Sequence, residues 1–390
     1  MINIKSFLKI KVKGIYHNLQ ATIDKRIINE RLSKYSTSIV KNVPPKQVKR
    51  ITFVIERMSK FGGGQTSILR LGTKLSDLGY DVSYVVYKNQ SVAEMKDCAN
   101  SNLSGYKGSM YTNKDLKNLK QDVVIASSWD TVAFAKKMNG YTMYFLQDFE
   151  PYFFPFGELF LLALKTYEQG LHMVSLGTWN KEMVLKNCNV ISPIDTVDFP
   201  YERSEYKEVS RDYKSYSSKK EFIVAVYLKY YGKRLPCIIQ YMLKQVKEEF
   251  LKDGITLNIK YYGEDKSFKC EGGENLGMLT KKQLFELYSK ADFGIVASMS
   301  NVSLVPYEML ATGLSLIEFE DGTFPYFFPE NSAILTSISY KDLYLKMKEA
   351  ILNPSILEEM HMNSKKHLET LSWDKTAKQF SDILEKLPES

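Results

Sequence analysis

Two successive series of alternating strand-type and helix-type segments constrain the fold of this chain most. The first series begins with an apolar strand at residues 51–56, followed by a glycine-rich turn and a helix that ends near Leu78. The second begins at residues 222–228, after a polar, tyrosine-rich stretch at 201–220. Such alternation is typical of a mainly parallel sheet with helices on its faces. A chain of 390 residues is long enough for two such α/β domains.

These patterns divide the chain into four expected parts. They are a basic helical extension over 1–48, a first Rossmann-like domain over 49–215, a second over 216–372 and a C-terminal helix over 373–390. In two doubly wound domains the carboxyl ends of the strands face each other. Ligands are therefore expected in the crevice between the domains, and domain closure is expected to be part of the catalytic cycle.

The positive charge of the chain is concentrated at its start. Residues 1–50 hold nine lysines and three arginines against two acids, a net charge of +10, whereas the whole chain carries +8 and the remainder therefore −2. Lysines mix with apolar residues at roughly helical spacing over residues 1–45. This pattern fits a helix on an anionic membrane surface, or a helix packed on the body with solvated lysines. No nucleic-acid-binding motif accompanies the charge, so nucleic acid is not an expected partner.

Composition excludes several classes of protein. Four single cysteines and four dispersed histidines lack zinc-type spacing, so neither a metal nor another cofactor is expected, and reduced thiols fit a cytoplasmic protein. No apolar run approaches the roughly 18 residues that span a bilayer. Residues 1–14 lack the continuous apolar core of a signal peptide. We expect a cytoplasmic protein, free or peripheral at the inner face of the plasma membrane. Its oligomeric state is left open, a homodimer included.

The stretch 298–313 carries the strongest functional signal. It follows an apolar strand at 292–297 and opens a short helix that carries Glu308. Backbone N–H groups at a helix N-terminus suit a phosphate, and a carboxylate one turn later suits the hydroxyls of a ribose. The pattern indicates a sugar-nucleotide site, although an acid on the helix surface is the alternative for Glu308. The loop residues expected to contact the donor are Ser300, Asn301, Val302, Ser303 and Leu304.

A second phosphate-type loop lies far upstream and consists of Gly62, Gly63, Gly64 and Gln65. Because glycine has no Cβ, a phosphate or an acceptor can approach this backbone closely. A tight turn selected only for its geometry is the alternative.

Three segments resemble GT-B-fold glycosyltransferases of family four. They are FGGGQTSILRLGTKLSDLGYDV at 61–82, LGMLTKKQLFELYSKADFGIVAS at 276–298 and the stretch that ends in PYEMLATG at 306–313. A fourth, YFLQDFEPYFFP at 144–155, resembles bacterial rhamnosyltransferases that extend lipid-linked surface glycans, S-layer glycans among them, from dTDP-rhamnose. The resemblance covers residues 50–387. It implies two Rossmann-like domains facing each other across a cleft, with a C-terminal helix that packs back on the first.

The resemblance also implies a donor site. Lys229 and Arg234 match the basic pair that the family uses on the diphosphate, and Lys233 is placed to share that role. An exposed basic loop is the alternative. The loop at 276–279 is expected either to seat the base or to pack in the core. The further donor residues expected from the resemblance are Gly263, Leu276, Gly277 and Leu279.

One position departs from the family pattern. Many retaining members carry a glutamate eight residues before the ribose-binding one, and this chain has Ser300 there. The missing glutamate contacts hydroxyls of glucose- and mannose-type donors, so its loss fits a 6-deoxyhexose of inverted ring configuration. The same departure is the best argument for a non-catalytic scaffold.

Asp148 and Glu150 follow a strand at the expected cleft and are the candidate catalytic residues. A carboxylate there can polarise an acceptor hydroxyl or stabilise a cationic sugar, whereas fixing the loop is the alternative for each. Acceptor contacts are expected from Trp129, Phe149 and Tyr152, because sugars stack their apolar faces on aromatic rings. Core packing is the alternative for these aromatic residues.

The prediction that follows is a metal-independent glycosyltransferase. It moves L-rhamnose from dTDP-rhamnose to a hydroxyl of a growing, lipid-linked glycan, and the resemblance implies retention of anomeric configuration. A transferase or epimerase that uses a UDP- or GDP-hexose, and a non-catalytic scaffold in a glycan assembly complex, remain as alternatives.

Overall fold

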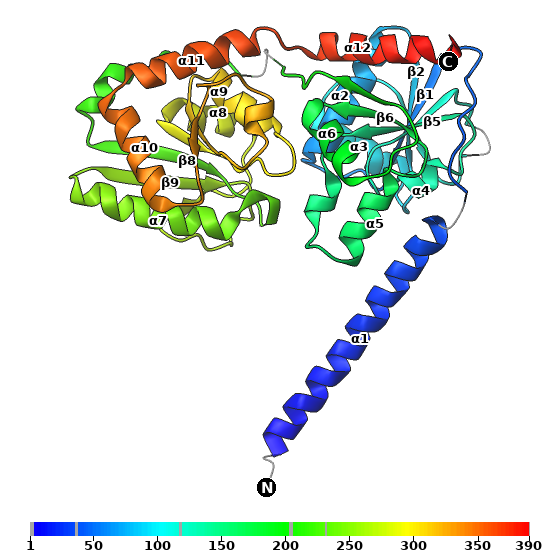
Figure 1. The fold of residues 1–390 in the computed structure, drawn as a ribbon, viewed down its shortest axis with the longest axis horizontal. Coiled ribbons are helices and arrows are strands. Elements are labelled where there is room, and N and C mark those ends of the chain that lie inside the picture. Colours follow the sequence, from blue (N-terminus) through cyan, green and yellow to red (C-terminus); the bar gives the residue numbers. More distant parts are fainter. Residues whose placement is uncertain (1–3, 36–37, 117–118, 203–205, 231, 390) are drawn as a thin grey trace.

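The computed structural model describes residues 4–35, 38–116, 119–202, 206–230 and 232–389 and contains two parallel sheets (Figure 1). The seven-stranded sheet has the order β3-β2-β1-β4-β5-β6-β7, and the six-stranded sheet has the order β10-β9-β8-β11-β12-β13. The strands of the first sheet are β1 Arg50–Ile55, β2 Asp81–Val86, β3 Ser109–Thr112, β4 Val123–Ala126, β5 Tyr141–Leu146, β6 His172–Leu176 and β7 Ile194–Val197. Those of the second are β8 Glu221–Tyr227, β9 Thr256–Tyr262, β10 Glu274–Asn275, β11 Phe293–Ile295, β12 Ser315–Phe319 and β13 Ile334–Thr336.

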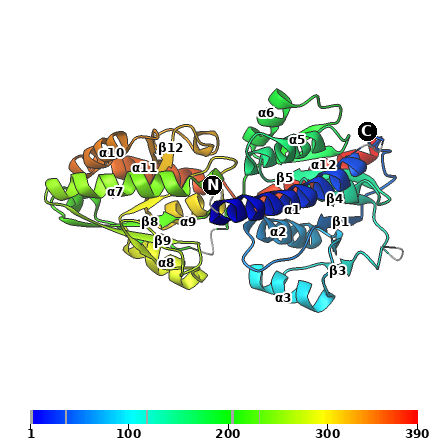
Figure 2. The same ribbon diagram turned by 90° about the horizontal axis from the view of Figure 1, so that it is seen from below.

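Each sheet with its helices forms a domain, and helices cover both faces of each sheet (Figure 2). The central strands are buried on both faces and consist of near-continuous apolar runs, as parallel strands require. The first domain contains α2 Gly63–Asp77, α3 Val92–Asn102, α4 Val132–Ala135, α5 Glu158–Thr166 and α6 Thr178–Asn187. The second contains α7 Pro236–Lys252, α8 Lys281–Lys290, α9 Leu304–Ala311, α10 Tyr340–Leu352 and α11 Ser355–Leu368.

Both sheets reverse their strand order beside their first strand. β1 lies between β2 and β4, and β8 lies between β9 and β11. At such switch points the connecting segments leave in opposite directions, which opens a crevice beyond the carboxyl ends of the strands. The loops that follow β5, β8 and β11 are therefore placed to form a ligand site.

The C-terminal helix α12, Trp373–Lys386, crosses back onto the first domain (Figure 1). Its Phe380 meets Phe145 of β5 with ring centroids 6.0 Å apart, and Asp374 pairs with Lys74 of α2 at 2.8 Å. This confirms the expected fold, in which two Rossmann-like domains are joined by a helix that returns to the first.

The N-terminal helix α1, Ile4–Tyr35, projects away from both domains (Figure 1). Near its C-terminal end, Ile28 packs beside Trp129, and the Arg31 guanidinium lies 4.0 Å from the centre of the Trp129 ring. This differs from a helix packed along the body. Within the described part of the chain, no helix combines the length and apolarity needed to cross a membrane. Apolar side chains spaced by four residues are nevertheless exposed along α1, namely Ile15, Leu19, Ile23 and Ile27.

Candidate active site

The two domains meet where β5 and β11 end. The side-chain amide of Asn301 donates a hydrogen bond to the carbonyl of Gln147, and the N–H of Phe149 donates to the carbonyl of Ser300 at 3.1 Å. The hydroxyl of Ser300 donates to Asp148 Oδ1 at 2.9 Å. Residues far apart in the sequence are thus joined directly across the crevice.

Asp148 forms an ion pair with Lys233 at this junction. Lys233 Nζ lies 3.1 Å from Asp148 Oδ1 and 4.0 Å from the centre of the Phe153 ring. Burial lowers the pKa of Lys233, and the charge of Asp148 opposes that effect. The side chains of Asp148 and Lys233 stay 24% and 20% exposed, so a ligand can reach both.

Glu150, two residues further along, lies on the other side of this loop and is 5% exposed. Its Oε2 accepts hydrogen bonds from the N–H of Trp129 and the hydroxyl of Tyr144, both at 2.5 Å. Burial raises the pKa of Glu150 to about 8. Of the two candidate carboxylates, Asp148 thus lies part-exposed at the domain junction, whereas Glu150 is buried and hydrogen bonded within the first domain.

The three expected acceptor-binding aromatic residues are divided in the same way. Phe149 is 1% exposed and stacks on Tyr167, while Trp129 is 7% exposed and lies under Arg31. Tyr152 is 43% exposed and faces the crevice. Tyr152 can therefore stack on a sugar, whereas Phe149 and Trp129 pack in the interior.

The loop before α9 contains polar atoms without partners. The Oδ1 of Asn301 and the Oγ of Ser303 are buried, and no described residue hydrogen bonds to them. Buried polar atoms in proteins normally have partners, so these two favour a ligand that supplies them. Ser303 and Leu304 mark the start of α9, while Val302 is 1% exposed and offers a ligand only its backbone.

Glu308 lies one turn into α9 and is half-buried. Burial raises the pKa of Tyr262, at the end of β9, well above its usual value, and the nearby charge of Glu308 raises it further. The charge of Glu308 thus acts on Tyr262, which lies at the end of β9 in the second sheet.

The two expected phosphate-binding cations differ in their surroundings. Arg234 is 8% exposed, and its Nη1 donates to the carbonyl of Ala297 at 2.8 Å, which fixes the end of the segment that leads into the α9 loop. Lys229 is half-buried, and its Nζ lies 3.6 Å from the sulfur of Met278. Lys229 thus bridges the end of β8 and the loop at 276–279.

That loop depends on two glycines. Gly263 has φ +105°, and a Cβ there would lie 2.7 Å from the carbonyl oxygen of Leu228. Its N–H donates to the carbonyl of Gly277, which has φ +83°, at 3.0 Å. Leu276 and Leu279 are partly buried against the core. Their side chains pack while the backbone of the loop stays at the edge of the crevice.

The glycine loop approaches the same junction from the first domain. Gln65 secures it, since its Oε1 accepts from the N–H of Ser59 and its Nε2 donates to the carbonyl of Arg57, both at 2.7 Å. Gly62 is the N-cap of α2, which begins at Gly63, and no side chain caps that end. A Cβ on Gly64 would lie 3.5 Å from Gln147 Oε1, so this loop borders the crevice.

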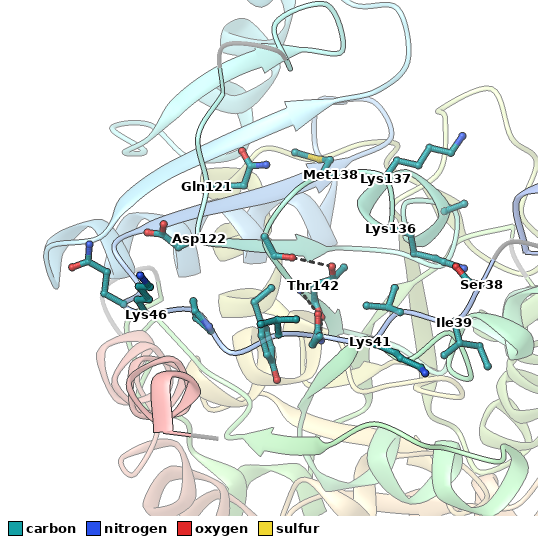
Figure 3. Close-up of a pocket in the computed structure, with 18 residues that line it drawn as sticks. Ser38, Ile39, Lys41, Lys46, Gln121, Asp122, Lys136, Lys137, Met138 and Thr142 are labelled. Atoms are coloured by element: carbon teal, nitrogen blue, oxygen red, sulfur yellow. Dashed lines mark hydrogen bonds between the residues drawn. The ribbon is translucent and has the colours of Figure 1, made fainter.

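Two of the surface hollows are large enough to hold a ligand. One, of about 570 Å³, lies between the domains and includes Tyr152 and Lys233. The other, of about 890 Å³, lies at the amino ends of β4 and β5, under the segment at 38–47 (Figure 3). Asn42 holds that segment through two hydrogen bonds to the backbone of Thr142, at 2.9 and 2.8 Å. Ligands of parallel sheets bind at the carboxyl ends of strands, so the hollow between the domains is the candidate active site.

Sequence reasoning missed part of the hollow between the domains. Trp179 lines it from the first domain, and Glu320, Asp321 and Tyr326 line it from the second. The signal that points to the two acids is the Glu-Asp-Gly sequence directly after β12. In the described ranges, no group of three or more His, Cys, Asp or Glu side chains is placed to hold a metal ion.

Solved glycosyltransferase structures share this arrangement. Neither a protein-family profile nor a curated protein sequence matches the chain. HepE from Anabaena, in complex with UDP and glucose, is 12% identical with a TM-score of 0.66, over 86% of this chain and 99% of its own. A glycosyltransferase from Rickettsia africae is 12% identical with a TM-score of 0.65, over 87% and 98%.

TarM, a protein of S. aureus, is 9% identical with a TM-score of 0.67, over 86% of this chain and 98% of its own. At these identities the likeness concerns the fold. This chain has the GT-B fold. The strand order, the facing switch points and the returning helix α12 all agree with that assignment.

Proposed function

We propose that this protein is a sugar-nucleotide-dependent glycosyltransferase that moves L-rhamnose from dTDP-rhamnose to a hydroxyl of a growing, lipid-linked surface glycan, with retention. The observation that carries the proposal is the Asp148–Lys233 pair at the junction of the domains. The α9 loop of one domain and the glycine loop of the other flank it. A carboxylate and a cation there face the two charges that develop in the reaction, a cationic sugar and an anionic diphosphate.

The chemistry follows from that placement. The bond between C1 of the sugar and the diphosphate oxygen breaks, and a bond from C1 to the acceptor oxygen forms on the same face. The acceptor proton passes to the departing phosphate, and dTDP leaves. Lys229, Lys233 and the N–H groups at the start of α9 stabilise the diphosphate, as cations and helix N-termini do. Asp148 stabilises the positive charge on the sugar.

Three features favour dTDP-rhamnose as the donor. Residues 144–155 resemble the S-layer rhamnosyltransferase WsaF, and Ser300 replaces the glutamate that serves glucose- and mannose-type donors. The sugar of thymidine offers only its 3′-hydroxyl, for which the carboxylate of Glu308 suffices. A UDP-hexose is the second candidate donor, because the similarly folded HepE was crystallised with UDP and glucose.

Calorimetric titration of dTDP, UDP, GDP and dTDP-rhamnose without added metal tests this function. Selective binding of the thymidine nucleotides supports rhamnose transfer. Preference for UDP or GDP would keep a transferase and discard rhamnose. If none of the four binds, the non-catalytic scaffold is the remaining hypothesis. Binding without turnover would favour the same scaffold.

We predict that Glu308→Ala weakens dTDP binding about 10- to 150-fold, because a hydrogen bond to a charged group contributes roughly 1.5–3 kcal/mol. Glu286→Ala on the exposed face of α8 removes the same charge from the same domain and is the matched control. Calorimetry measures both variants. Equal affinities for wild type and Glu308→Ala would remove Glu308 from the nucleotide site.

We also propose that α1 binds an anionic membrane and brings the enzyme to a lipid-linked acceptor. The double substitution Leu19→Glu and Ile23→Glu is expected to weaken binding to phosphatidylglycerol vesicles by at least about tenfold, because it places charge on the exposed apolar stripe. His17→Glu with Ala21→Glu adds the same charge to the opposite face of the helix and is the control. Vesicle sedimentation measures both, and equal loss in the two variants would indicate a non-specific charge effect.

A further inference from the structure

The hollow between the domains contains aromatic side chains from both. Trp179 of α6 lies with its ring 6.3 Å from that of Tyr152 in the first domain and 6.5 Å from that of Tyr326 in the second. Tyr152 is 43% exposed and Tyr326 is 54% exposed, although aromatic residues beside them are buried. Open aromatic faces within a hollow suit the apolar face of a sugar ring.

Two carboxylates line the same hollow from a fixed loop. Glu320 and Asp321 directly follow β12 and are both exposed. The N–H of Gly322 donates to the carbonyl of Phe319 at 3.0 Å, and the hydroxyl of Thr323 donates to the carbonyl of Ser298 at 2.9 Å. The loop is therefore fixed to the end of the second sheet. Carboxylates accept hydrogen bonds from neutral hydroxyls, and Glu320 also lies 3.9 Å from Lys346 Nζ.

The hollow lies apart from Lys229 and the loop at 276–279, and Lys233 is the diphosphate-type residue that also lines it. β12 neighbours β11 on the side away from β8 and β9, where Lys229 and the loop at 276–279 lie. Lys233 lines the hollow and also pairs with Asp148. The ion pair thus stands at the border of the hollow, where a hydroxyl held inside can reach the reacting sugar.

We propose that this hollow of about 570 Å³ binds a sugar ring of the acceptor glycan, with its apolar face on Tyr152 and Tyr326 and its hydroxyls on Glu320 and Asp321. The inference rests on the proposed function and names its acceptor site. The sugar ring of the donor could be bound by the same chemistry. The experiment below distinguishes the acceptor sugar from the donor sugar.

The test compares Asp321→Asn and Tyr326→Ala with two surface controls. Glu330→Gln changes an exposed acid further along the same connection, and Tyr241→Ala removes an exposed tyrosine of α7. Saturation-transfer NMR measures binding of methyl α-L-rhamnoside, methyl α-D-glucoside and methyl α-D-mannoside, and calorimetry measures dTDP and dTDP-rhamnose. We expect the two hollow variants to bind the preferred glycoside about tenfold more weakly, with dTDP-rhamnose affinity unchanged. The controls should match wild type.

The other outcomes are distinct. Weaker binding of dTDP-rhamnose with unchanged binding of dTDP would assign the hollow to the sugar of the donor and overturn the acceptor site. Unchanged glycoside binding in both variants, or no glycoside binding by wild type, would also overturn it. If the proposed function is wrong, wild type will bind none of the nucleotides. The glycoside measurement is made without nucleotide, so it tests the acceptor site independently.

Discussion

Asp148→Asn is expected to lower the turnover of sugar transfer by about 100- to 1,000-fold while leaving the affinity for dTDP within about twofold. Asparagine keeps an oxygen that can accept from Ser300 and Lys233, so the junction between the domains stays closed. What it removes is the negative charge beside the reacting sugar. Because that charge matters most when the sugar becomes cationic, the loss should appear in kcat rather than in donor binding.

Radiolabelled transfer to a glycan acceptor measures turnover, and calorimetry measures binding. Asp77→Asn is the matched control, since Asp77 also pairs with a lysine, Lys107, and lies at the end of α2 opposite the glycine loop. The control should retain full turnover. Wild-type turnover in Asp148→Asn would show that the departing phosphate catalyses the transfer without help from this carboxylate.

Buried strands were the most predictable part of this fold. The strands expected at 51–56, 222–228 and 292–297 are β1, β8 and β11, and their ends agree to within two residues. These strands lie inside their sheets, where packing on both faces demands runs of apolar residues. The edge strands Ser109–Thr112 and Ile194–Val197 were missed, because they are largely half-exposed and lack such a run.

The polar, tyrosine-rich stretch at 201–220 separates the two series of strands and helices in the sequence, yet some of its tyrosines belong to the core. Tyr213 and Tyr216 are 6% and 4% exposed and pack with the second domain. The hydroxyl of Tyr213 donates to the carbonyl of Gly313 at 2.5 Å. Composition could not reveal this, since a buried tyrosine needs a hydrogen-bond partner that lies 100 residues away along the chain.

The candidate site shows the same limit. Local patterns placed the loops after β5 and β8 and the segment before α9 in the crevice, because the carboxyl ends of parallel strands share an edge. They could not separate Asp148 from Glu150. That distinction depends on a backbone N–H from Trp129 and a hydroxyl from Tyr144, which tertiary packing brings to Glu150.

Glu150→Ala is expected to lower the free energy of unfolding of the first domain by about 3–5 kcal/mol. The substitution leaves the N–H of Trp129 and the hydroxyl of Tyr144 buried without their acceptor, and it opens a cavity. Urea unfolding followed by tryptophan fluorescence measures the change. Glu182→Ala on the exposed face of α6 is the control and should stay within about 0.5 kcal/mol of wild type.

Glu150→Gln separates the role of the proton from that of the hydrogen bonds. Burial raises the pKa of Glu150 to about 8, so the folded protein keeps this proton at a pH where the unfolded chain, with a pKa near 4.5, has lost it. The contribution of Glu150 to stability is therefore fully present below about pH 4.5 and declines as the pH rises towards 8. Glutamine cannot ionise, so the variant should gain about 2–4 kcal/mol of stability relative to wild type between pH 5 and pH 8.

The pKa of Glu318 is also raised by burial, to about 8. Its contribution to stability declines equally in both proteins, so it cancels in the comparison. Parallel stability curves for wild type and variant would mean that Glu150 is ionised in the folded protein at neutral pH, and that its two hydrogen bonds hold a charged carboxylate.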